Sequence, residues 1–370
     1  MKATVCLNMI VKNEAPVIRR CLESVRPLID TWVIVDTGST DGTQNIIREF
    51  LGDLPGVLHE RPWRGFGASR TEAIDLARPS ADYLLFLDAD DLMEVLPGFR
   101  MPDLTLDAYR LAVHHPPVVH WRPALVSTRL PWTYVGVLHE YLHCEAPYSS
   151  GVLEGAHIQI VGGGARGREG SEREKYLRDA AILEKGLLEE PDNTRYAFYL
   201  AQSWRDAGEA EKSLAAYDLR AGMGGFAEEA YCARLYAARL AARLDRPAGE
   251  VMDRYLRAYE SRPRRAEALC DLARLCRVEG RWPLAYMFAR QAVRIPRPDD
   301  ILFVEVDCHG WRALDELAVS AYWTGAYQES LDCSERLLRE GGLPEDQRAR
   351  VRGNLDFARL KLDPDYQVVA

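Results

Sequence analysis

The stretch "YLLFLDADDLMEV", residues 83–95, decides how the first part of the chain folds. Four apolar residues run directly into a cluster of three aspartates, Asp88, Asp90 and Asp91. An apolar run of this kind is typical of a buried strand in a parallel sheet, where ligands bind beyond the carboxyl ends of the strands. We therefore expect these carboxylates to serve a ligand.

The spacing within the acidic cluster indicates which ligand. Asp88 and Asp90 are two positions apart, so they point to the same side of an extended chain, and the small Ala89 between them leaves room. Two carboxylates with few other protein ligands suit Mg²⁺ or Mn²⁺ shared with a substrate phosphate. The alternative is an acidic helix N-terminus, in which Asp91 begins a helix over "DLMEVL".

The chain up to about residue 165 alternates strands with helices. Apolar runs predict strands over 3–11, 31–36 and 82–88, and helical periodicity predicts helices over 13–29, 41–51 and 70–78. Strand and helix alternation with fully apolar strands indicates an α/β domain whose Rossmann-like sheet is covered on both faces.

The strand pattern stops at about Glu172, and paired helical segments follow. The expected turns at Gly208, near Asp245, at Gly280 and at Gly325 are about 36, 36 and 45 residues apart, near the period of tetratricopeptide-like helix–turn–helix repeats. The Gly-rich bridge at 162–172 separates the two patterns. We predict an α/β domain over 1–165 and an all-α repeat domain over 172–370.

Composition narrows the class of protein further. The chain has 370 residues and a net charge of −9, which disfavours extended nucleic-acid binding. Its eight cysteines form no C-x-x-C pair, so neither a zinc site nor a disulfide framework is predicted, and buried thiols are expected. The N-terminal residues do not resemble a signal peptide, and no stretch is apolar enough to span a membrane. We expect a cytoplasmic protein without membrane contact.

A second acidic strand end supports a ligand site in the first domain. The segment "VIVDTGSTDGTQ", residues 33–44, places Asp36 at a strand end and follows it with Gly, Ser and Thr. An acid in this position accepts hydrogen bonds from a nucleobase or a ribose, and glycines let the backbone approach a ligand. A plain strand-to-helix turn is the alternative.

Taken in order, four segments resemble one known family. "LNMIVKNEAPVIRRCLESV", "WVIVDTGSTDGTQNII", "GFGASRTEAIDLA" and "DYLLFLDADD" are similar to the family 2 glycosyltransferases of the GT-A fold, over roughly residues 3–165. With its helical second half, the chain resembles the members that carry a tetratricopeptide-like domain. The resemblance implies a mixed α/β sheet of GT-A type.

The resemblance also assigns roles to individual residues. Asp88 and Asp90 match the D-x-D motif that holds a divalent ion against the diphosphate of a sugar nucleotide, and Asp36 matches the acid that contacts the nucleoside. Glu14 and Arg70 match positions near the nucleotide. Thr37 stands where many relatives have a second acid, which leaves base recognition open, and Thr71 stands where they have an Asn.

A third element supplies the candidate base and the third metal ligand. "LPWTYVGVLHEYLHC", residues 130–144, resembles the G-x-x-H-E element of tetratricopeptide-linked members. We assign His139 to the metal or diphosphate and Glu140 to proton abstraction or acceptor contact, with the two roles interchangeable at this point. His157 is a rival third ligand, and Asp91 is a second candidate base.

Other features of the first domain leave alternatives open. Trp63 and Trp132 either stack on a sugar or belong to the core, and residues 114–123, "HHPPVVHWRP", are expected to form a loop on the acceptor side.

The sequence and the resemblance together predict a metal-dependent glycosyltransferase that uses Mn²⁺ or Mg²⁺ and a nucleotide-sugar, and the resemblance implies inversion and favours UDP. A peptide, protein or glycan acceptor is favoured, a modified DNA base is a further option, and the repeats are candidates for homodimer formation. The alternatives are a repeat scaffold with a decayed transferase domain and a sugar-1-phosphate nucleotidyltransferase. Sugar-1-phosphate nucleotidyltransferases have a Gly-rich loop directly after the first strand, whereas this chain has "VKNEAP" there, without a glycine.

Overall fold

The structure is a computed structural model that describes residues 2–115, 118–168, 170–340, 342–363 and 365–366. It contains two compact units, Met1–Lys212 and Ser213–Ala370. The predicted boundary at 162–172 lies where the strands give way to helices, since the last strand of the main sheet of the first unit ends at Ile160. The division between compact units falls later because two further helices pack with the α/β part.

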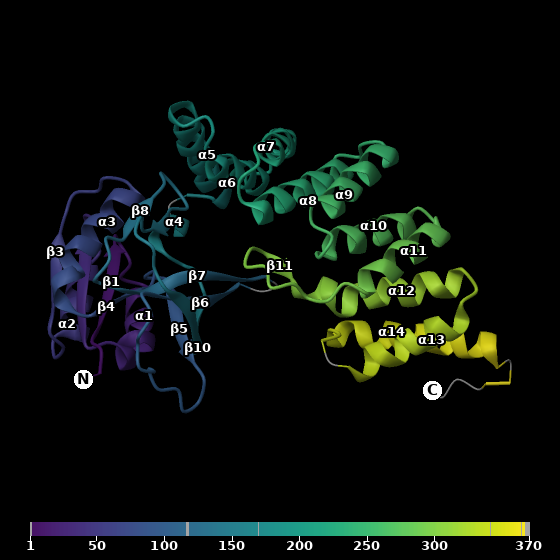
Figure 1. The fold of residues 1–370 in the computed structure, drawn as a ribbon, viewed down its shortest axis with the longest axis horizontal. Helices are drawn as coiled ribbons and strands as arrows, with labels where there is room; N and C mark the ends of the chain where they lie inside the picture. The colour runs from purple at the N-terminus through teal and green to yellow at the C-terminus, as the bar shows by residue number, and fades with distance from the viewer. Residues whose placement is uncertain (1, 116–117, 169, 341, 364, 367–370) are drawn as a thin grey trace. The chain divides into compact units, whose positions relative to one another are not determined.

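The first unit is built on a mixed sheet with the strand order β3-β2-β1-β4-β7-β6-β10-β5 (Figure 1). Neighbours among β1 to β4 run parallel, whereas β7 is antiparallel to β4 and to β6, and β5 is antiparallel to β10. The bounds are β1 Val5–Val11, β2 Thr31–Asp36, β3 Gly56–Glu60, β4 Tyr83–Phe86, β5 Asp91–Val95, β6 Ala108–His115, β7 Val118–Ser127 and β10 Ser150–Ile160. The predicted mixed α/β sheet is confirmed.

Helices cover both faces of the parallel strands, as their apolar sequences predict. Along β1, Leu7 and Met9 pack in the core that also contains residues of α1 (Ile18–Val25) and α2 (Thr43–Leu51). The alternate residue Cys6 packs in the core that includes Ile74 and Ala77 of α3 (Phe66–Ala77). The side-chain alternation of an extended strand thus assigns neighbouring residues to opposite faces.

A buried asparagine joins the layers. Asn8, in the middle of β1, donates from its side-chain amide to Val33 O at 3.1 Å and to Ala73 O at 2.9 Å. An unpaired buried amide would destabilise the core, so this bonding fixes α3 against β1 and β2.

One alternative and one expectation from the sequence are wrong. Residues 91–95 form strand β5 and not the start of a helix, because they pair with β10 from Asp91 opposite Ile160 to Val95 opposite Ala156. The described part of 114–123 belongs to the β6–β7 hairpin, with His114 opposite Val119, and not to a loop on the acceptor side. Residues 116–117 lie outside the described residues.

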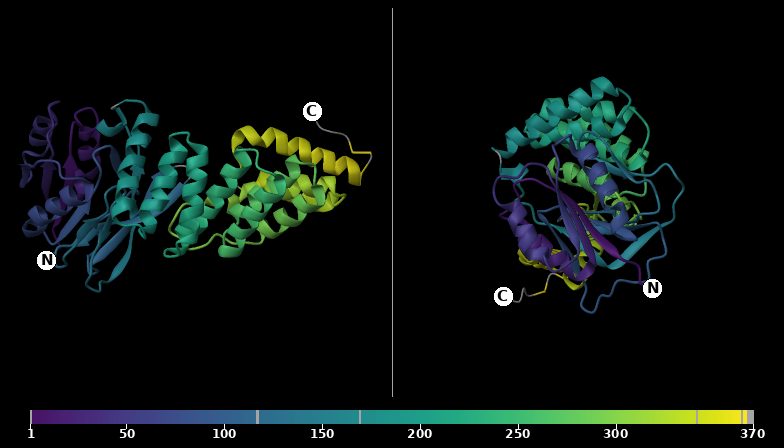
Figure 2. Two further views of the ribbon diagram at one scale, coloured as in Figure 1. Left: turned by 90° about the horizontal axis from the view of Figure 1, so that it is seen from above. Right: turned by 90° about the vertical axis from the view of Figure 1, so that its left-hand side faces the viewer.

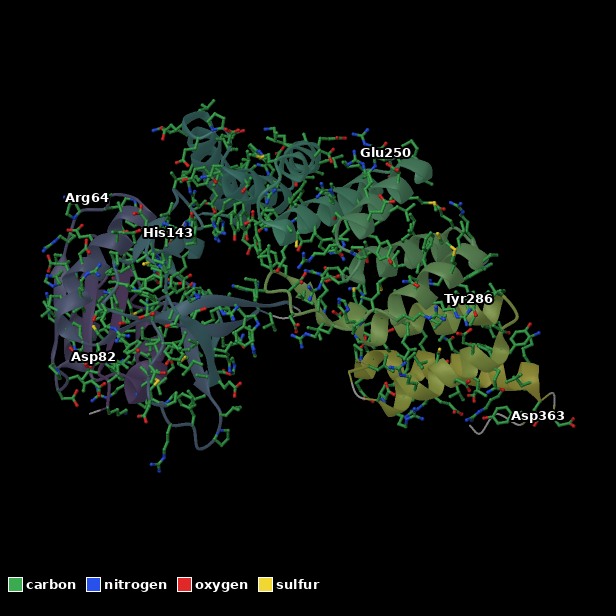
Figure 3. All side chains as sticks on the ribbon, in the orientation of Figure 1. Arg64, Asp82, His143, Glu250, Tyr286 and Asp363 are labelled. Atoms are coloured by element: carbon green, nitrogen blue, oxygen red, sulfur yellow. The ribbon has the colours of Figure 1, made fainter. Side chains whose placement is uncertain are left out.

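A short hairpin and three helices complete the first unit. The strands β8 (Thr133–Val135) and β9 (Tyr141–His143) pair antiparallel, and residues 136–140 connect them. The helices are α4 (Ala165–Arg168), α5 (Glu172–Glu189) and α6 (Thr194–Asp206). His143, labelled in Figure 3, marks the end of this hairpin.

Short turns join the two helices of each pair in the rest of the chain, as the repeat pattern predicts. These helices are α7 Ala210–Gly222, in which the second unit begins, and α8 Ala227–Arg243, α9 Ala248–Ser261, α10 Glu267–Val278, α11 Trp282–Val293, α12 Trp311–Trp323, α13 Tyr327–Arg339 and α14 Glu345–Leu362. A longer segment separates α11 from α12. Figure 2 shows them in green to yellow, packed in succession. A short strand β11 (Val304–Glu305) and the 3-10 helix Val306–His309 precede α12.

The four expected turn positions share one backbone conformation. Gly208, Asp245, Gly280 and Gly325 have φ values of 81°, 51°, 70° and 83°. Each lies just beyond the end of the first helix of a pair, where a left-handed residue ends the helix and reverses the chain. The predicted helix–turn–helix organisation is confirmed.

Candidate functional site

The site is built where β1, β2 and β4 end together. Because these strands are parallel neighbours, with Val11 opposite Asp36, the loops that follow them meet at one edge of the sheet. These loops carry Glu14, Asp36 and Asp88. The structure thus brings together residues from three separate segments.

Of the two carboxylate oxygens of Asp36, one accepts hydrogen bonds from its own loop and the other has no donor within the part of the chain that the structure describes. Its Oδ1 accepts from the backbone N–H of Gly38 at 2.9 Å and of Ser39 at 2.8 Å. Its Oδ2 is buried and has no hydrogen-bond partner among the described residues. A buried unpaired acceptor is costly in a folded protein, so this oxygen is suited to a donor group from a ligand.

The loops after β1 and β2 hold each other in place. Asn13, at a positive φ of 56°, donates from its backbone to Ser39 Oγ at 2.8 Å and accepts from Thr40 N at 2.8 Å. The Glu14 N–H donates to Thr43 Oγ1 at 2.8 Å. The loop that contains Asp36 is therefore preorganised before any ligand arrives.

Glu14 is held by the segment that follows β10. Its carboxylate accepts from the Ala165 N–H at 3.0 Å, and Arg168 approaches within 3.9 Å. Burial raises the pKa of Glu14 to about 7, the charge of Asp90 adds to the rise, and the bond from Ala165 opposes it. The Gly-rich bridge therefore lies against the predicted nucleotide-binding edge.

Two arginines hold Asp88. Arg70, on α3, forms an ion pair with it, and Arg122 Nη1, on β7, donates to Asp88 Oδ2 at 3.2 Å. Burial alone raises the pKa of Asp88, but the charges and hydrogen bonds of Arg70 and Arg122 lower it well below its usual range. Asp88 is thus held as a carboxylate.

Arg70 also reaches the loop between β8 and β9. Its Nε donates to Glu140 Oε1 at 2.6 Å, and its guanidinium lies 5.4 Å from the centre of the Tyr134 ring. Thr71 Oγ1 accepts from the Tyr134 N–H at 2.9 Å, which ties α3 to the same hairpin. The predicted base Glu140 is therefore brought next to the D-x-D segment.

The other two aspartates of the cluster have different surroundings. Asp90 Oδ2 accepts from the Gly164 N–H at 3.2 Å. Asp91 is buried, and Arg122 lies 3.8 Å from its carboxylate. Burial, together with the charge of Asp88, raises the pKa of Asp91 to about 7.

The two histidine candidates lie in other contacts. The His139 ring stacks on Tyr199 of α6 at 3.9 Å, and its backbone oxygen accepts from Arg195 Nε at 2.8 Å. His157 Nε2 lies 3.0 Å from Glu94 on β5, and its ring stacks on His114 at 4.1 Å. In the described part of the chain, no group of three or more His, Cys, Asp or Glu side chains is arranged to hold a metal ion. The third-ligand assignment stays a prediction.

Asp88 and Asp90 nevertheless have the right chemistry for a divalent cation. Carboxylate oxygens are the ligands that Mg²⁺ and Mn²⁺ prefer, and Mg²⁺ keeps several waters when one or two carboxylates and a substrate phosphate bind it. The Asp90 carboxylate accepts one backbone hydrogen bond, whereas the Asp88 carboxylate contacts two guanidinium groups. Asp90 therefore has more lone pairs open to a metal ion. The donor set fits an ion that takes its remaining ligands from water and diphosphate.

Comparison with known proteins finds a family match over part of this site. Residues 6–95 match the family model described as "Glycosyl transferase family 2". The chain carries a family 2 glycosyltransferase domain. The matched segment contains Asp36, Asp88 and Asp90, and the resemblance that their motifs indicated is confirmed.

Curated relatives match this chain over a limited length. A TPR repeat-containing protein of Synechococcus elongatus is 42% identical over 89 residues, which cover 24% of this chain and 21% of that protein. The SPbeta prophage-derived glycosyltransferase SunS of Bacillus subtilis is 32% identical over 89 residues, 24% of this chain and 20% of SunS. The lipopolysaccharide core biosynthesis glycosyltransferase LpsC of Rhizobium meliloti is 32% identical over 97 residues, 26% of this chain and 35% of LpsC. The matches span between a fifth and about a third of these relatives.

Solved structures resemble the chain more weakly. The C-terminal part of a TPR repeat-containing protein from Cytophaga hutchinsonii aligns with 51% of this chain and 67% of its own, at 14% identity and a TM-score of 0.39. This score is too low to establish a common fold, so the description of the helical part rests on its own helices and turns.

Sequence reasoning missed some features of the chain and left others open. Arg122, which contacts Asp88 and Asp91, lies in a segment that carries no recognised motif. Trp132 is 1% exposed and donates to Ser127 O at 2.9 Å, so it belongs to the core, whereas Trp63 is 43% exposed beside Phe66. All eight cysteines are buried, as expected.

Within the described residues, none of the helices combines the length and the apolar character that a bilayer span requires.

Proposed function

We propose that this protein is a glycosyltransferase that moves a sugar from a nucleotide-sugar to an acceptor. The observation that carries the proposal is Asp36 Oδ2, a buried acceptor without a partner at the same sheet edge as Asp88 and Asp90. A nucleoside supplies the missing N–H or O–H donor, and a diphosphate brings the negative charge that the neighbouring cations attract. The family 2 match over residues 6–95 supports this reading.

We assign different charged residues to the diphosphate and to the nucleoside of the donor. Arg70 and Arg122 provide two fixed positive charges near the acidic cluster, and such preorganised charges stabilise a leaving diphosphate. Asp90, with Asp88, would hold Mn²⁺ or Mg²⁺, which supplies further neutralisation of the diphosphate when bound. Asp36 and Glu14 would contact the nucleoside side of the donor, which we expect to be UDP-linked.

Glu140 is our candidate for the base. In the proposed step its carboxylate takes the proton from the nucleophilic group of the acceptor, which then bonds to the anomeric carbon. The bond between that carbon and the diphosphate oxygen breaks, and its electron pair leaves with the diphosphate, so the configuration inverts. Asp91 is the second candidate, because its pKa of about 7 suits proton transfer near neutral pH.

The acceptor is proposed only as a class. A peptide, protein or glycan is favoured over a modified DNA base because the chain is acidic overall. The cytoplasmic location and a homodimer through the helical repeats stay predictions.

The first test is thermal stabilisation by nucleoside diphosphates. Wild type is heated with UDP, GDP, TDP or CDP, each with and without Mn²⁺, beside Asp90→Ala and the control Asp103→Ala, an exposed acid elsewhere in the same unit. A ligand at a hundred times its Kd stabilises the native state by about 2.7 kcal/mol. We expect a Mn²⁺-dependent shift with one nucleotide, kept in Asp103→Ala and lost in Asp90→Ala.

The alternatives predict other results. A decayed transferase domain on a repeat scaffold gives no shift with any nucleotide. Retention of the full Mn²⁺-dependent shift in Asp90→Ala contradicts the metal assignment. Release of the nucleoside diphosphate from the matching nucleotide-sugar, with sugar attached to an acceptor, then separates transfer from mere binding.

A further inference from the structure

A feature of the second unit is not used by sugar transfer. Two pockets of about 560 and 550 Å³ share Arg274 and Arg312 in their walls, and we call them together the arginine groove. Its walls come from helices between α8 and α14 and from strand β11, which carries Glu305. Six arginines line it: Arg239, Arg243, Arg274, Arg277, Arg312 and Arg350.

Two shared acidic side chains hold two of these arginines. Arg239 and Arg312 both contact Asp271 and Glu305, with Arg239 Nη2 3.0 Å from Glu305 Oε2 and Arg312 Nη2 3.2 Å from Asp271 Oδ1. These shared carboxylates fix both guanidinium groups at the wall of the groove. Burial alone lowers the pKa of Arg312, but the neighbouring Cys308 and Cys270 and the carboxylates of Asp271 and Glu305 raise it above its usual value.

Two more arginines of the groove are also held by carboxylates. Arg277 donates to both oxygens of Glu316, at 2.6 and 3.1 Å, and Arg350 donates to both oxygens of Asp315, at 3.1 and 2.9 Å. Such two-point pairing gives a guanidinium a defined orientation. The walls are therefore preorganised.

Arg243 and Arg274 complete the groove and differ from the other four. Both are exposed, and neither forms an ion pair or a hydrogen bond with any other residue that the structure describes. Six arginines face four wall carboxylates, and Asp307 adds a fifth that lies 4.0 Å from Arg312, so the groove has an excess of one positive charge in a chain whose net charge is −9. An excess of this sign, confined to one groove, is complementary to an anionic occupant.

The remaining wall groups indicate what kind of anion fits. Asn354 offers a side-chain amide suited to a peptide backbone, whereas the Gln347 amide already bonds to Asp346 and Arg350. Trp311 and the exposed Val278 offer apolar surface. The four wall carboxylates would repel a continuous phosphate backbone, whereas a polypeptide with spaced carboxylates avoids them. The geometry therefore favours an acidic peptide over a nucleic acid.

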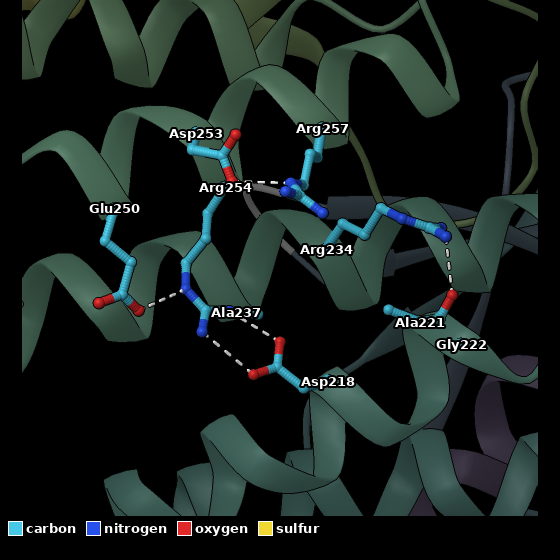
Figure 4. A pocket seen from close by; sticks show the side chains of 9 residues that line it. All are labelled: Asp218, Ala221, Gly222, Arg234, Ala237, Glu250, Asp253, Arg254 and Arg257. Carbon is cyan, nitrogen blue, oxygen red and sulfur yellow. Dashed lines mark hydrogen bonds and ion pairs between the residues drawn. The ribbon is translucent and has the colours of Figure 1, made fainter.

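Another pocket of the same unit has arginines and acids in equal number, unlike the arginine groove. It has a volume of about 400 Å³ and contains three arginines and three acids (Figure 4). Arg254 is paired with Asp218 and with Glu250, which is also labelled in Figure 3, and Arg257 is paired with Asp253. This pocket has no excess of charge, so it serves as an internal control.

We propose that the arginine groove binds an acidic, extended segment of a partner polypeptide, with Arg243 and Arg274 as the contacts open to its carboxylates. The proposal is independent of the proposed sugar transfer, since it uses none of the residues of that site. It assigns to the helical unit a partner class that its helical pattern does not reveal.

The experiment measures binding by fluorescence anisotropy on the full chain. The probe is a fluorescein-labelled peptide in which Glu alternates with Ala, beside a peptide with Gln in place of Glu and a labelled single-stranded oligothymidine. The double variant Arg243→Glu/Arg274→Glu is compared with Arg257→Glu/Arg352→Glu, which reverses the same number of exposed charges outside the groove.

We expect the Glu peptide to bind wild type more tightly than the Gln peptide and to weaken with added salt. The groove variant should lose about tenfold in affinity and the control variant much less. Equal losses in both variants, or equal binding of the Glu and Gln peptides, would overturn the proposal. Tighter binding of oligothymidine than of the Glu peptide would overturn the peptide assignment. Because all four substituted side chains are exposed, circular dichroism melting should show that each variant folds.

Discussion

Arg70 Nε donates to Glu140 Oε1 at 2.6 Å, although the two residues are 70 positions apart in the chain. The same guanidinium pairs with Asp88, so one side chain of α3 joins the D-x-D segment to the loop between β8 and β9. The side chain of Arg70 is 17% exposed, and that of Glu140 is 10% exposed. A pair this sheltered is sensitive to the loss of either partner.

The first prediction concerns this contact. Arg70→Ala leaves two partly buried carboxylates without their shared cation, so we expect the free energy of unfolding to fall by about 3–5 kcal/mol. Arg70→Lys should keep more of the stability but still lose about 10²–10³-fold in turnover, because a lysine cannot bridge both acids in the same geometry. Urea unfolding and release of the nucleoside diphosphate measure the two effects separately.

A matched control for Arg70 lies nearby. Arg61 pairs with Glu72 on α3 at 3.1 Å, but both side chains are more exposed than those of the Arg70–Glu140 pair. Arg61→Lys should change stability and turnover little. An Arg70→Lys variant as active as Arg61→Lys would contradict the bridging role.

The second prediction tests the unpaired oxygen of Asp36. In Asp36→Asn the amide oxygen replaces Oδ1 and keeps the bonds from Gly38 and Ser39, and the amide nitrogen then stands where Oδ2 accepts. The amide N–H is a donor at a position where Asp36 Oδ2 would accept from the nucleoside, so nucleotide affinity should fall about 10–100-fold while the melting temperature of the free protein changes little.

Calorimetric titration with the nucleotide found by the thermal screen provides the measurement for Asp36. Asp53→Asn serves as the control, since Asp53 is an exposed acid that pairs with Arg26 away from the site. Unchanged nucleotide affinity in Asp36→Asn would remove Asp36 from the donor site.

The sequence predicts the strands near the site well and the polar contacts across the site poorly. Apolar runs locate β1, β2 and β4 because burial on both faces leaves little choice of residue. Residues 91–95 mislead because an acidic start followed by Leu and Met suits a helix, and only pairing with β10 makes them a strand. The role of Arg122 cannot be predicted from the sequence, because it depends on the position of β7 beside β4.

The boundary between the two halves shows the same limit. The change of pattern at 162–172 marks where strands end, yet α5 and α6 belong to the first compact unit. The structure shows why, since the Val137 N–H donates to Tyr196 Oη at 3.2 Å and His139 stacks on Tyr199. Helices of repeat-like sequence thus support the loop that carries Glu140, and periodicity alone does not reveal such a contact.

The third prediction concerns the Gly-rich bridge. A Cβ placed on the buried Gly164 would lie 2.6 Å from Asp90 Oδ2, whereas a Cβ on Gly167 meets nothing within 4 Å. Gly164→Ala should therefore displace Asp90 or lift the bridge, at a cost of about 1–3 kcal/mol in stability. Gly167→Ala should stay within about 0.5 kcal/mol of wild type.

The functional readout for Gly164 is the Mn²⁺ concentration needed for nucleotide binding. If Asp90 holds the metal, Gly164→Ala raises this concentration and Gly167→Ala does not. Equal Mn²⁺ dependence in the two variants would show that the contact between Gly164 and Asp90 has no part in binding the metal.

The last prediction concerns stability and pH in the second unit. Glu267 is fully buried, and Arg265 Nε donates to it at 2.9 Å. Burial alone would raise the pKa of Glu267, but His309, 3.6 Å away, and Arg265 together lower it to about 2. The native state therefore favours the ionised form. This contribution to stability is complete above the usual pKa of about 4.5 and is lost as the pH falls toward 2.

Glu267→Gln should unfold about 3–5 kcal/mol more easily than wild type at pH 7, because Arg265 loses a buried partner. The difference between the two proteins should shrink as the pH falls from about 4.5 toward 2, since wild type becomes protonated at this position and the variant does not titrate there. Urea unfolding at pH 7 and at several acidic pH values measures this difference. The control is Glu279→Gln. Glu279 pairs with Arg281 and is more exposed than Glu267, so this variant should show no such pH dependence. A constant difference between wild type and Glu267→Gln across this range would contradict the lowered pKa and assign the loss to packing alone.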